Sequence, residues 1–177
     1  AALPGMKERT LVIDSLSKTY AMTGWRIGYA AGPENVIRNM VKLQENVSAC
    51  AAPPCQVAAI EALEGPQDHL KYMVEQYRLR RDYVMRRISE IPGLSCHAPA
   101  GTFYAFIDIS QLGMPCEEFA MKLLEERQVV VVPGTAFGEF GEGYIRLSYA
   151  TSMQCLEQGL QELEEFVRSH KTEGDPA

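Results

Sequence analysis

Four side chains that could bind and react with a phosphorylated carbonyl compound lie within twelve residues near the start of the chain. Lys18 follows two serines, Ser15 and Ser17, and Arg26 comes eight residues later. A lysine amine attacks a carbonyl carbon once burial or a neighbouring cation lowers its pKa. A guanidinium and hydroxyls bind phosphate. These residue types indicate a site for a ligand with both groups, although a solvated loop lysine and a surface arginine would give the same sequence.

Two short strands are expected to position this group. The β-branched run at residues 10–13 predicts a buried strand, and Lys18 would lie on the loop where that strand ends. After a break at residues 23–24, residues 25–31 alternate large apolar side chains with Arg26 and Gly28, which predicts a second strand. Lysine and arginine would then face one small space. Pyridoxal phosphate carries the aldehyde and the phosphate that such a pair could bind.

The segment from Ser15 to Tyr29, SLSKTYAMTGWRIGY, resembles the cofactor-lysine segment of class I and II aminotransferases. These are fold-type I pyridoxal-phosphate enzymes related to aspartate aminotransferase. The resemblance implies that Lys18 forms the Schiff base, while Ser15, Ser17 and Arg26 hold the cofactor phosphate. It also implies an α/β protein whose active enzyme transfers an amino group from an amino acid to a 2-oxo acid, with the freed lysine amine moving the proton.

The same resemblance predicts the domain organisation. Residues 1–65 would be a remnant of the large cofactor-binding domain, and residues 66–177 would form a connecting helix and a small C-terminal α/β domain. In the family, the lysine lies behind most of a large domain that supplies an aspartate and a ring-stacking aromatic residue, and neither has a candidate upstream of Lys18. We therefore expect a C-terminal fragment that is inactive by itself, from a protein that forms homodimers.

Hydrophobic periodicity predicts the remaining elements. Helices are expected after Pro33 as far as Val47, at residues 56–63 and at residues 68–91. Beyond Pro92-Gly93 the pattern indicates strand, strand, helix, strand, strand, helix, an order typical of helices covering one side of a small sheet. These six elements are residues 94–97, 101–109, 115–127, 129–132, 144–148 and 153–170. The glycine-rich residues 133–143 would be a mobile loop.

Arg146 is the second candidate binding residue. It lies between Ile145 and Leu147 on a predicted strand, so its guanidinium would point away from the buried face, where a carboxylate could bind it through paired hydrogen bonds. A surface arginine on an edge strand is the alternative. The segment also resembles the family stretch that ends in the carboxylate-binding arginine, which implies that Arg146 binds substrate. By the same resemblance Phe103 borders the substrate, although the residue type and position favour core packing over this role.

Composition excludes several other classes of protein. The net charge is -6 and no basic stripe occurs, which argues against nucleic acid as a partner. Five cysteines without Cys-x-x-Cys spacing and three scattered histidines predict no metal site and suggest reduced thiols in the cytoplasm. No apolar run of membrane-spanning length and no leader are apparent, so we expect no membrane partner. The alternative function is a pyridoxal-phosphate sensor domain of an aminotransferase-like transcription regulator, which would carry a DNA-binding domain upstream.

Overall fold

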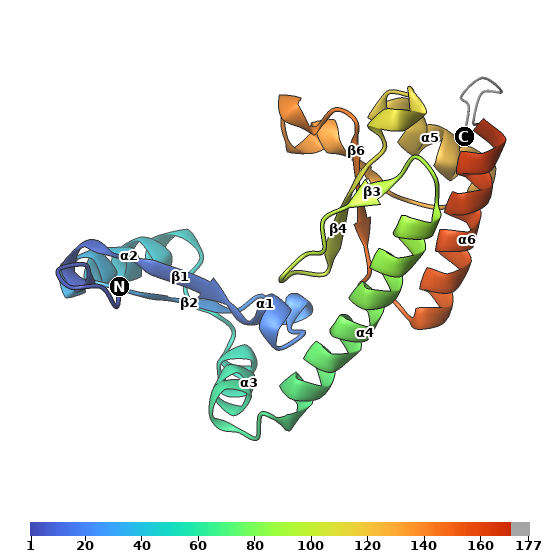
Figure 1. Cartoon of the computed structure of the whole chain (residues 1–177). Coiled ribbons are helices and arrows are strands. Elements are labelled where there is room, and N and C mark those ends of the chain that lie inside the picture. The colour runs from blue at the N-terminus through green and yellow to red at the C-terminus, as the bar shows by residue number, and fades with distance from the viewer. Residues whose placement is uncertain (171–177) are drawn as a thin grey trace. The chain divides into compact units, whose positions relative to one another are not determined.

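The computed structural model describes residues 1–170, and the chain divides into two compact units. The first unit comprises Ala1–Tyr72, and the second begins at Met73. The division falls inside the longest helix, α4 (Asp68–Glu90), which is coloured green in Figure 1. The sequence-based border between residues 65 and 66 stays a prediction. Each unit is described by itself below.

The first unit is built on a two-stranded antiparallel sheet. Strand β1 (Val12–Ser15) pairs with β2 (Gly28–Ala31), and Ser15 lies opposite Gly28 in the register. A Cβ atom at Gly28 would lie 2.5 Å from the Asp14 carbonyl oxygen, so glycine is needed for this close pairing. Helix α1 (Leu16–Thr19) and a 3₁₀ turn (Thr23–Trp25) connect the two strands, and another 3₁₀ turn (Lys7–Arg9) precedes them.

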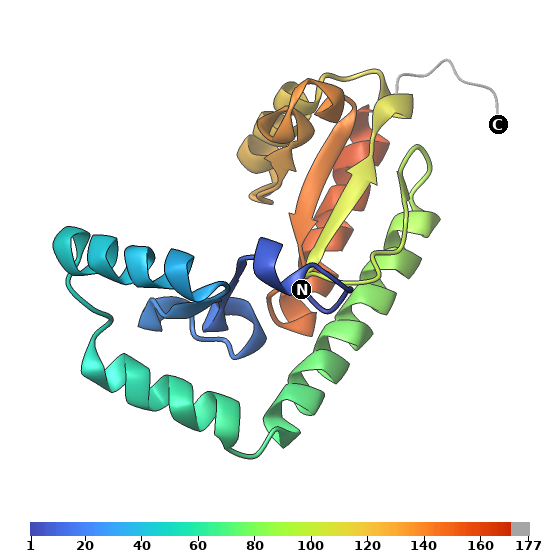
Figure 2. The same cartoon turned by 90° about the vertical axis from the view of Figure 1, so that its left-hand side faces the viewer.

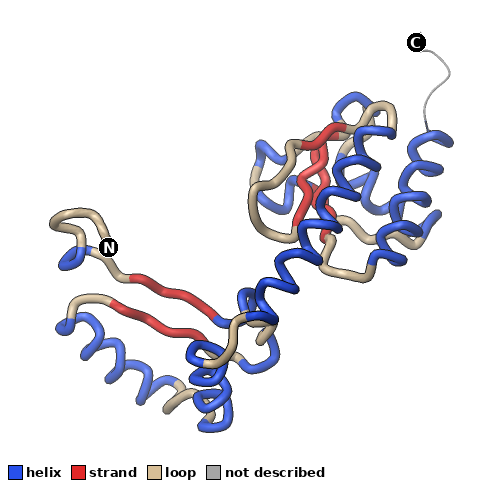
Figure 3. Tube along the Cα trace, turned by 60° about the horizontal axis from the view of Figure 1, so that its bottom comes forward, coloured by secondary structure: helices blue, strands red, loops and turns tan. Residues whose placement is uncertain are grey.

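Two longer helices follow in this unit, as the periodicity predicted. They are α2 (Glu34–Val47) and α3 (Pro53–Glu64), and Figure 3 shows both in blue beside the red strands. Proline starts α3 at its first position, where a missing N–H costs nothing. Its Ala59 packs with Leu16 and Met22 in a small core. Helix α2 has no buried residue, so its apolar face contributes little to this core.

The structure corrects three local predictions for the first unit. Strand β1 starts two residues later than expected and extends through Ser15. Lys18 lies in the helical turn α1 rather than on an open loop. Arg26 precedes strand β2 instead of belonging to it, because its backbone is left-handed, with φ of 50°. Such a conformation costs a non-glycine residue about 1 kcal/mol and ends the preceding turn.

The second unit contains a four-stranded antiparallel sheet in the order β3-β4-β6-β5. The strands are β3 (Ser95–Cys96), β4 (Tyr104–Asp108), β5 (Val132–Pro133) and β6 (Tyr144–Ser148). Figure 2 shows β4 in yellow beside β6 in orange. Helices α5 (Cys116–Arg127) and α6 (Met153–His170) complete the predicted order of elements, which is confirmed. The outer strands are shorter than expected: β3 and β5 have two residues each.

One hydrophobic core holds the helices of the second unit against one face of its sheet. Ile107 of β4 and Ile145 of β6 are fully buried and point to this face. Helix α6 contributes apolar residues at three- and four-residue steps, which places them on one side of the helix. The buried members from the three helices are Val84, Ile88, Cys116, Phe119, Ala120, Leu123, Leu156, Leu160, Leu163, Phe166 and Val167. The opposite face of the sheet therefore carries the alternate residues of β4 and β6.

The segment between β5 and β6 is more ordered in structure than the expected loop. It forms two 3₁₀ turns, Gly134–Phe137 and Glu139–Gly141. Gly134 and Gly141 approach so closely that a Cβ on either would overlap the carbonyl oxygen of the other. Two glycines thus close the segment on itself. Within residues 1–170, no helix has the length and apolar character needed to span a membrane.

Candidate active site

The two predicted phosphate-binding serines lie together where β1 ends. The Ser15 hydroxyl donates to Ser17 Oγ at 2.8 Å and accepts from the Ser17 N–H at 3.1 Å, so it caps α1. The Leu16 N–H donates to the Ile27 carbonyl at 3.3 Å, and Ser15 Oγ lies 3.4 Å from the same oxygen. This backbone contact joins the serine turn to the residue after Arg26.

Arg26 and Lys18 are placed by the two turns of the same unit. The left-handed backbone of Arg26 allows its guanidinium to return to the Thr23 carbonyl, to which Nη1 donates at 2.9 Å. Lys18 follows Ser17 within α1, and the side chains of both basic residues are exposed. Strained backbone conformations of this kind often occur at ligand sites. The hairpin end therefore combines two hydroxyls and two cationic side chains.

A carboxylate, that of Asp14, also lies at this end of the hairpin. Asp14 Oδ1 accepts the Ser15 N–H at 2.7 Å, and Oδ2 accepts the Tyr29 hydroxyl at 3.2 Å. The charge of Asp14 and this hydrogen bond raise the pKa of Tyr29 above its usual value. The donor types at residues 15, 17, 18 and 26 suit a phosphate and an aldehyde. The donor set fits the expected cofactor.

Arg146 lies on the sheet of the second unit, opposite Phe106 in the β4–β6 register. Ile145 and Leu147 are buried and Arg146 is half-buried, so its side chain lies on the other face, as predicted. Its Cζ atom is 4.2 Å from the centre of the Tyr104 ring and 4.5 Å from that of the Phe137 ring. Among residues 1–170, no carboxylate forms an ion pair with Arg146. A guanidinium held by rings keeps its donors for an anion.

Phe103 lies at the start of the same sheet but packs toward the core. Its ring is half-buried against the core cluster and stacks on Tyr77, with ring centres 5.9 Å apart. The ring also lies 4.5 Å from that of Tyr104. These contacts agree with the packing alternative, and a substrate contact for Phe103 stays a prediction.

The structure adds two residues that the sequence reasoning missed. The sequence predicts only a strand at Tyr104 and a loop at Phe137, yet both rings contact the Arg146 guanidinium. Tyr104 could have been found from the alternation in β4, since it shares a face with Phe106. Phe137 gives no comparable signal, because its position depends on the 3₁₀ turn that carries it.

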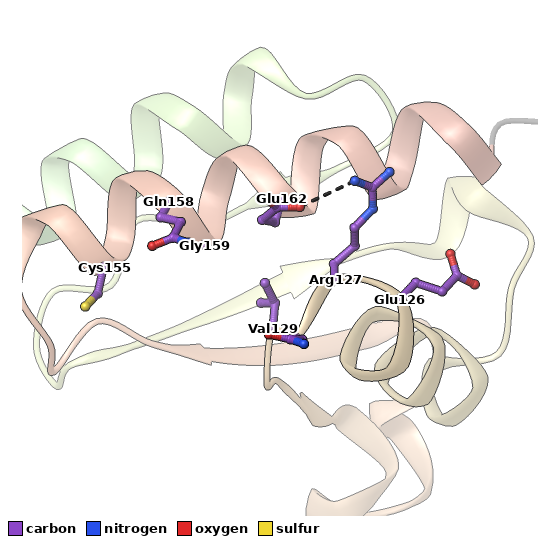
Figure 4. Close-up of a pocket in the computed structure, with 8 residues that line it drawn as sticks. Glu126, Arg127, Val129, Cys155, Gln158, Gly159 and Glu162 are labelled. Atoms are coloured by element: carbon purple, nitrogen blue, oxygen red, sulfur yellow. Dashed lines mark hydrogen bonds and ion pairs between the residues drawn. The ribbon is translucent and has the colours of Figure 1, made fainter.

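A recess elsewhere in the second unit lies between α6 and the end of α5. It has a volume of about 540 Å³, and Figure 4 shows Arg127 reaching Glu162 across it. Arg127 Nη1 lies 3.4 Å from Glu162 Oε2 and 2.9 Å from Glu165 Oε2, so its charge is already paired. None of the predicted site residues lines this recess. Within residues 1–170, no cluster of side chains could hold a metal ion.

Comparisons with known proteins match nearly the whole chain to aminotransferases. The family model described as aminotransferase class I and II matches residues 2–163. The putative aminotransferase YugH of Bacillus subtilis is 48% identical over 97% of this chain and 44% of its own length. An aspartate aminotransferase of Pyrococcus horikoshii is 43% identical over 93% of this chain and 42% of its own length.

Solved structures give the same result. The crystal structure of an aromatic aminotransferase from Pyrococcus horikoshii matches with a TM-score of 0.92 and 40% identity, over 97% of this chain and 46% of that chain. The aspartate aminotransferase of Rhizobium meliloti matches with a TM-score of 0.88 and 39% identity, over 94% of this chain and 44% of that one. The chain therefore spans somewhat less than half the length of these relatives.

Proposed function

Since the chain belongs to the class I and II aminotransferase family, we propose that it forms part of an enzyme that moves an amino group from an amino acid to a 2-oxo acid with pyridoxal phosphate. The matched structures confirm the predicted α/β fold of fold-type I aminotransferases. The observation that carries the proposal is the group of two hydroxyls and two cations at the end of the β1–β2 hairpin.

The whole protein's activity and partners are part of this proposal, because the chain covers 44% of YugH. We propose a homodimer for the whole protein and no activity for these 177 residues alone. A cytoplasmic location belongs to the same proposal. It depends on five cysteines, which are all free thiols, as a reducing compartment would leave them.

In this proposal, the end of the hairpin holds the phosphate of the cofactor. The hydroxyls of Ser15 and Ser17 already lie within hydrogen-bonding distance of each other, so both can turn toward one phosphate. Arg26 adds two features that hydroxyls lack, a permanent charge and a planar fork of donors. Its bond to the Thr23 carbonyl uses Nη1 and leaves other N–H groups for the phosphate.

Lys18 would supply the reacting amine. Pyridoxal phosphate, when bound, acts as an electron sink that stabilises negative charge on the amino acid carbon. The lysine Nζ atom would hold the cofactor through the aldehyde, and the freed amine would take and return the proton of that carbon as general base and acid.

Arg146 would bind the carboxylate shared by every amino acid and 2-oxo acid substrate. Its guanidinium is half-buried, contacts two rings and has no ion-pair partner among the described residues. Paired hydrogen bonds to a carboxylate would satisfy its donors. The choice of substrate side chain belongs to other residues, because a carboxylate is common to all candidates.

The proposal is tested by trapping the cofactor on the chain. The protein is incubated with pyridoxal phosphate, reduced with borohydride, digested, and analysed by mass spectrometry. We expect the added mass on the peptide that contains Lys18. Pyridoxal, which has the aldehyde but no phosphate, should label this lysine much less, and Arg26→Ala should reduce the difference between the two compounds.

Lys42 provides the matched control, since it is an exposed lysine on α2 of the same unit. Lys18→Ala should remove most of the specific label, whereas Lys42→Ala should retain it. Equal labelling of all lysines by both compounds would show that the hairpin does not bind the cofactor.

A further inference from the structure

The guanidinium of Arg146 is surrounded by side chains of two different segments. Tyr104 lies beside Arg146 on the neighbouring strand, whereas Phe137 comes from the 3₁₀ turn after β5. Phe137 also meets the ring of Phe106 edge-on, with ring centres 6.0 Å apart. A cation over an aromatic face is attracted by the negative charge of that face. Phe137 is nevertheless 51% exposed, so hydrophobic burial alone stabilises this position of its ring only weakly.

Contacts on both sides of Phe137 hold the turn that carries it. The Glu142 carboxylate accepts the backbone N–H of Cys116 at 2.9 Å and that of Gly143 at 3.1 Å, which ties the segment to the start of α5. The Thr135 hydroxyl donates to Glu117 Oε1 at 3.1 Å, one residue further along this helix. Gly134 and Gly141 close the segment at its base. The turn is thus fixed on both sides of Phe137.

We propose that Phe137 is a positioning residue for Arg146, and that the turn is fixed to α5 in order to keep this ring against the guanidinium. The proposal rests on the carboxylate role of Arg146 given above. A long arginine side chain has many rotamers, and binding an anion through two N–H groups requires one of them. Holding the guanidinium in advance reduces the entropy lost on binding. Phe137 would therefore increase carboxylate affinity without touching the carboxylate.

The test measures the side chain of Arg146 directly. In the ¹⁵N-labelled chain, the Nε–Hε signal of this arginine should be shifted upfield by the two ring currents, and Arg146→Lys identifies the signal by removing it. Acetate is the probe, and acetamide, which has the same shape without the charge, is its control. We expect acetate to move the Arg146 signal in a saturable way and acetamide to leave it unchanged.

Phe137→Leu should move the Arg146 signal downfield and weaken acetate binding about two- to five-fold, as expected for the loss of one cation–π contact. Phe140→Leu is the matched control, because Phe140 lies in the same segment and is 90% exposed. It should leave the signal and the affinity unchanged. Phe137→Tyr, which keeps the ring, should retain both the Arg146 signal position and the acetate affinity of the unsubstituted chain. If Phe137→Leu loses its dispersed amide spectrum, Phe137→Met gives the same comparison at nearly constant volume.

Unchanged acetate affinity in folded Phe137→Leu would overturn the positioning role and leave the carboxylate role of Arg146 intact. No response of Arg146 to acetate in the unsubstituted chain would overturn both. An equal loss in Phe137→Leu and Phe140→Leu would also overturn the proposal, because it would assign the effect to the segment as a whole rather than to the ring at position 137.

Discussion

Replacing Gly134 by alanine would test the closed form of the segment between β5 and β6. The added Cβ would overlap the carbonyl oxygen of Gly141 and lie 2.8 Å from that of Tyr144. Both obstacles are backbone atoms, and Tyr144 belongs to strand β6, so neither can move aside as a side-chain end would. The segment must therefore open at its base.

The expected cost follows from the kind of clash. Inserting one methyl group into a closely packed site destabilises a protein by about 1–3 kcal/mol when the surroundings must shift. Gly159 offers the opposite case, since it lies inside α6 and its added Cβ would meet nothing within 4 Å. Alanine in a helix interior is favoured over glycine by roughly 0.5–1 kcal/mol. The same glycine-to-alanine replacement should therefore lower the free energy of unfolding at position 134 and raise it at position 159.

Urea unfolding followed by circular dichroism measures both effects. Gly134→Ala should lower the unfolding midpoint and Gly159→Ala should raise it, with the slopes of the transitions unchanged. The Arg146 signal should also move in Gly134→Ala, because the turn carrying Phe137 is displaced. A midpoint for Gly134→Ala equal to or above that of the unsubstituted chain would refute the reasoning, since the space between Gly134 and Gly141 would then accommodate a methyl group.

Two further predictions concern titrating groups in the second unit. Hydrogen bonds from the backbone N–H groups of Cys116 and Gly143 lower the pKa of Glu142 below 4.5, so its stabilising effect is present above that value and is lost as the pH falls through the lowered pKa. Acid titration of unfolding in fixed urea should therefore show a smaller loss of stability for Glu142→Gln than for the unsubstituted chain, and a curve of unchanged shape would contradict this. Hydrogen bonds from the Ser152 and Thr151 hydroxyls lower the pKa of the exposed thiol of Cys155, whereas burial raises the pKa of Cys96. Iodoacetamide near neutral pH should label Cys155 first, as read by peptide mass spectrometry, and faster labelling of Cys96 would be the opposite of this expectation.

The sequence predicted the order of elements well because that order depends on local periodicity. The apolar steps of α6 and the alternation around Ile145 each require only a few neighbouring residues. Strand ends were less predictable, because pairing decides them. Residues 129–132 have strong strand propensity, yet β5 forms only at Val132–Pro133, where Arg146 and Ile145 offer partners.

The candidate site shows the same limit. The facing direction of Arg146 follows from alternation along one strand, so the sequence could predict it. The backbone of Arg26 could not be predicted, because a left-handed arginine contradicts local preference and is imposed by the turn that joins α1 to β2. The ring of Phe137 also contacts Arg146, which lies nine residues later in the sequence. No periodic pattern encodes a contact of this kind.

The position of Trp25 gives the chain a built-in optical reporter. This is the sole tryptophan of the sequence, it adjoins Arg26, and its indole is 47% exposed. Its fluorescence emission therefore comes from the first unit alone, while tyrosines such as Tyr144 and Tyr149 dominate the near-ultraviolet absorbance of the second. Quenching of the indole by a phosphorylated chromophore would be visible without any label, and heating curves at two wavelengths would separate the melting of the two halves.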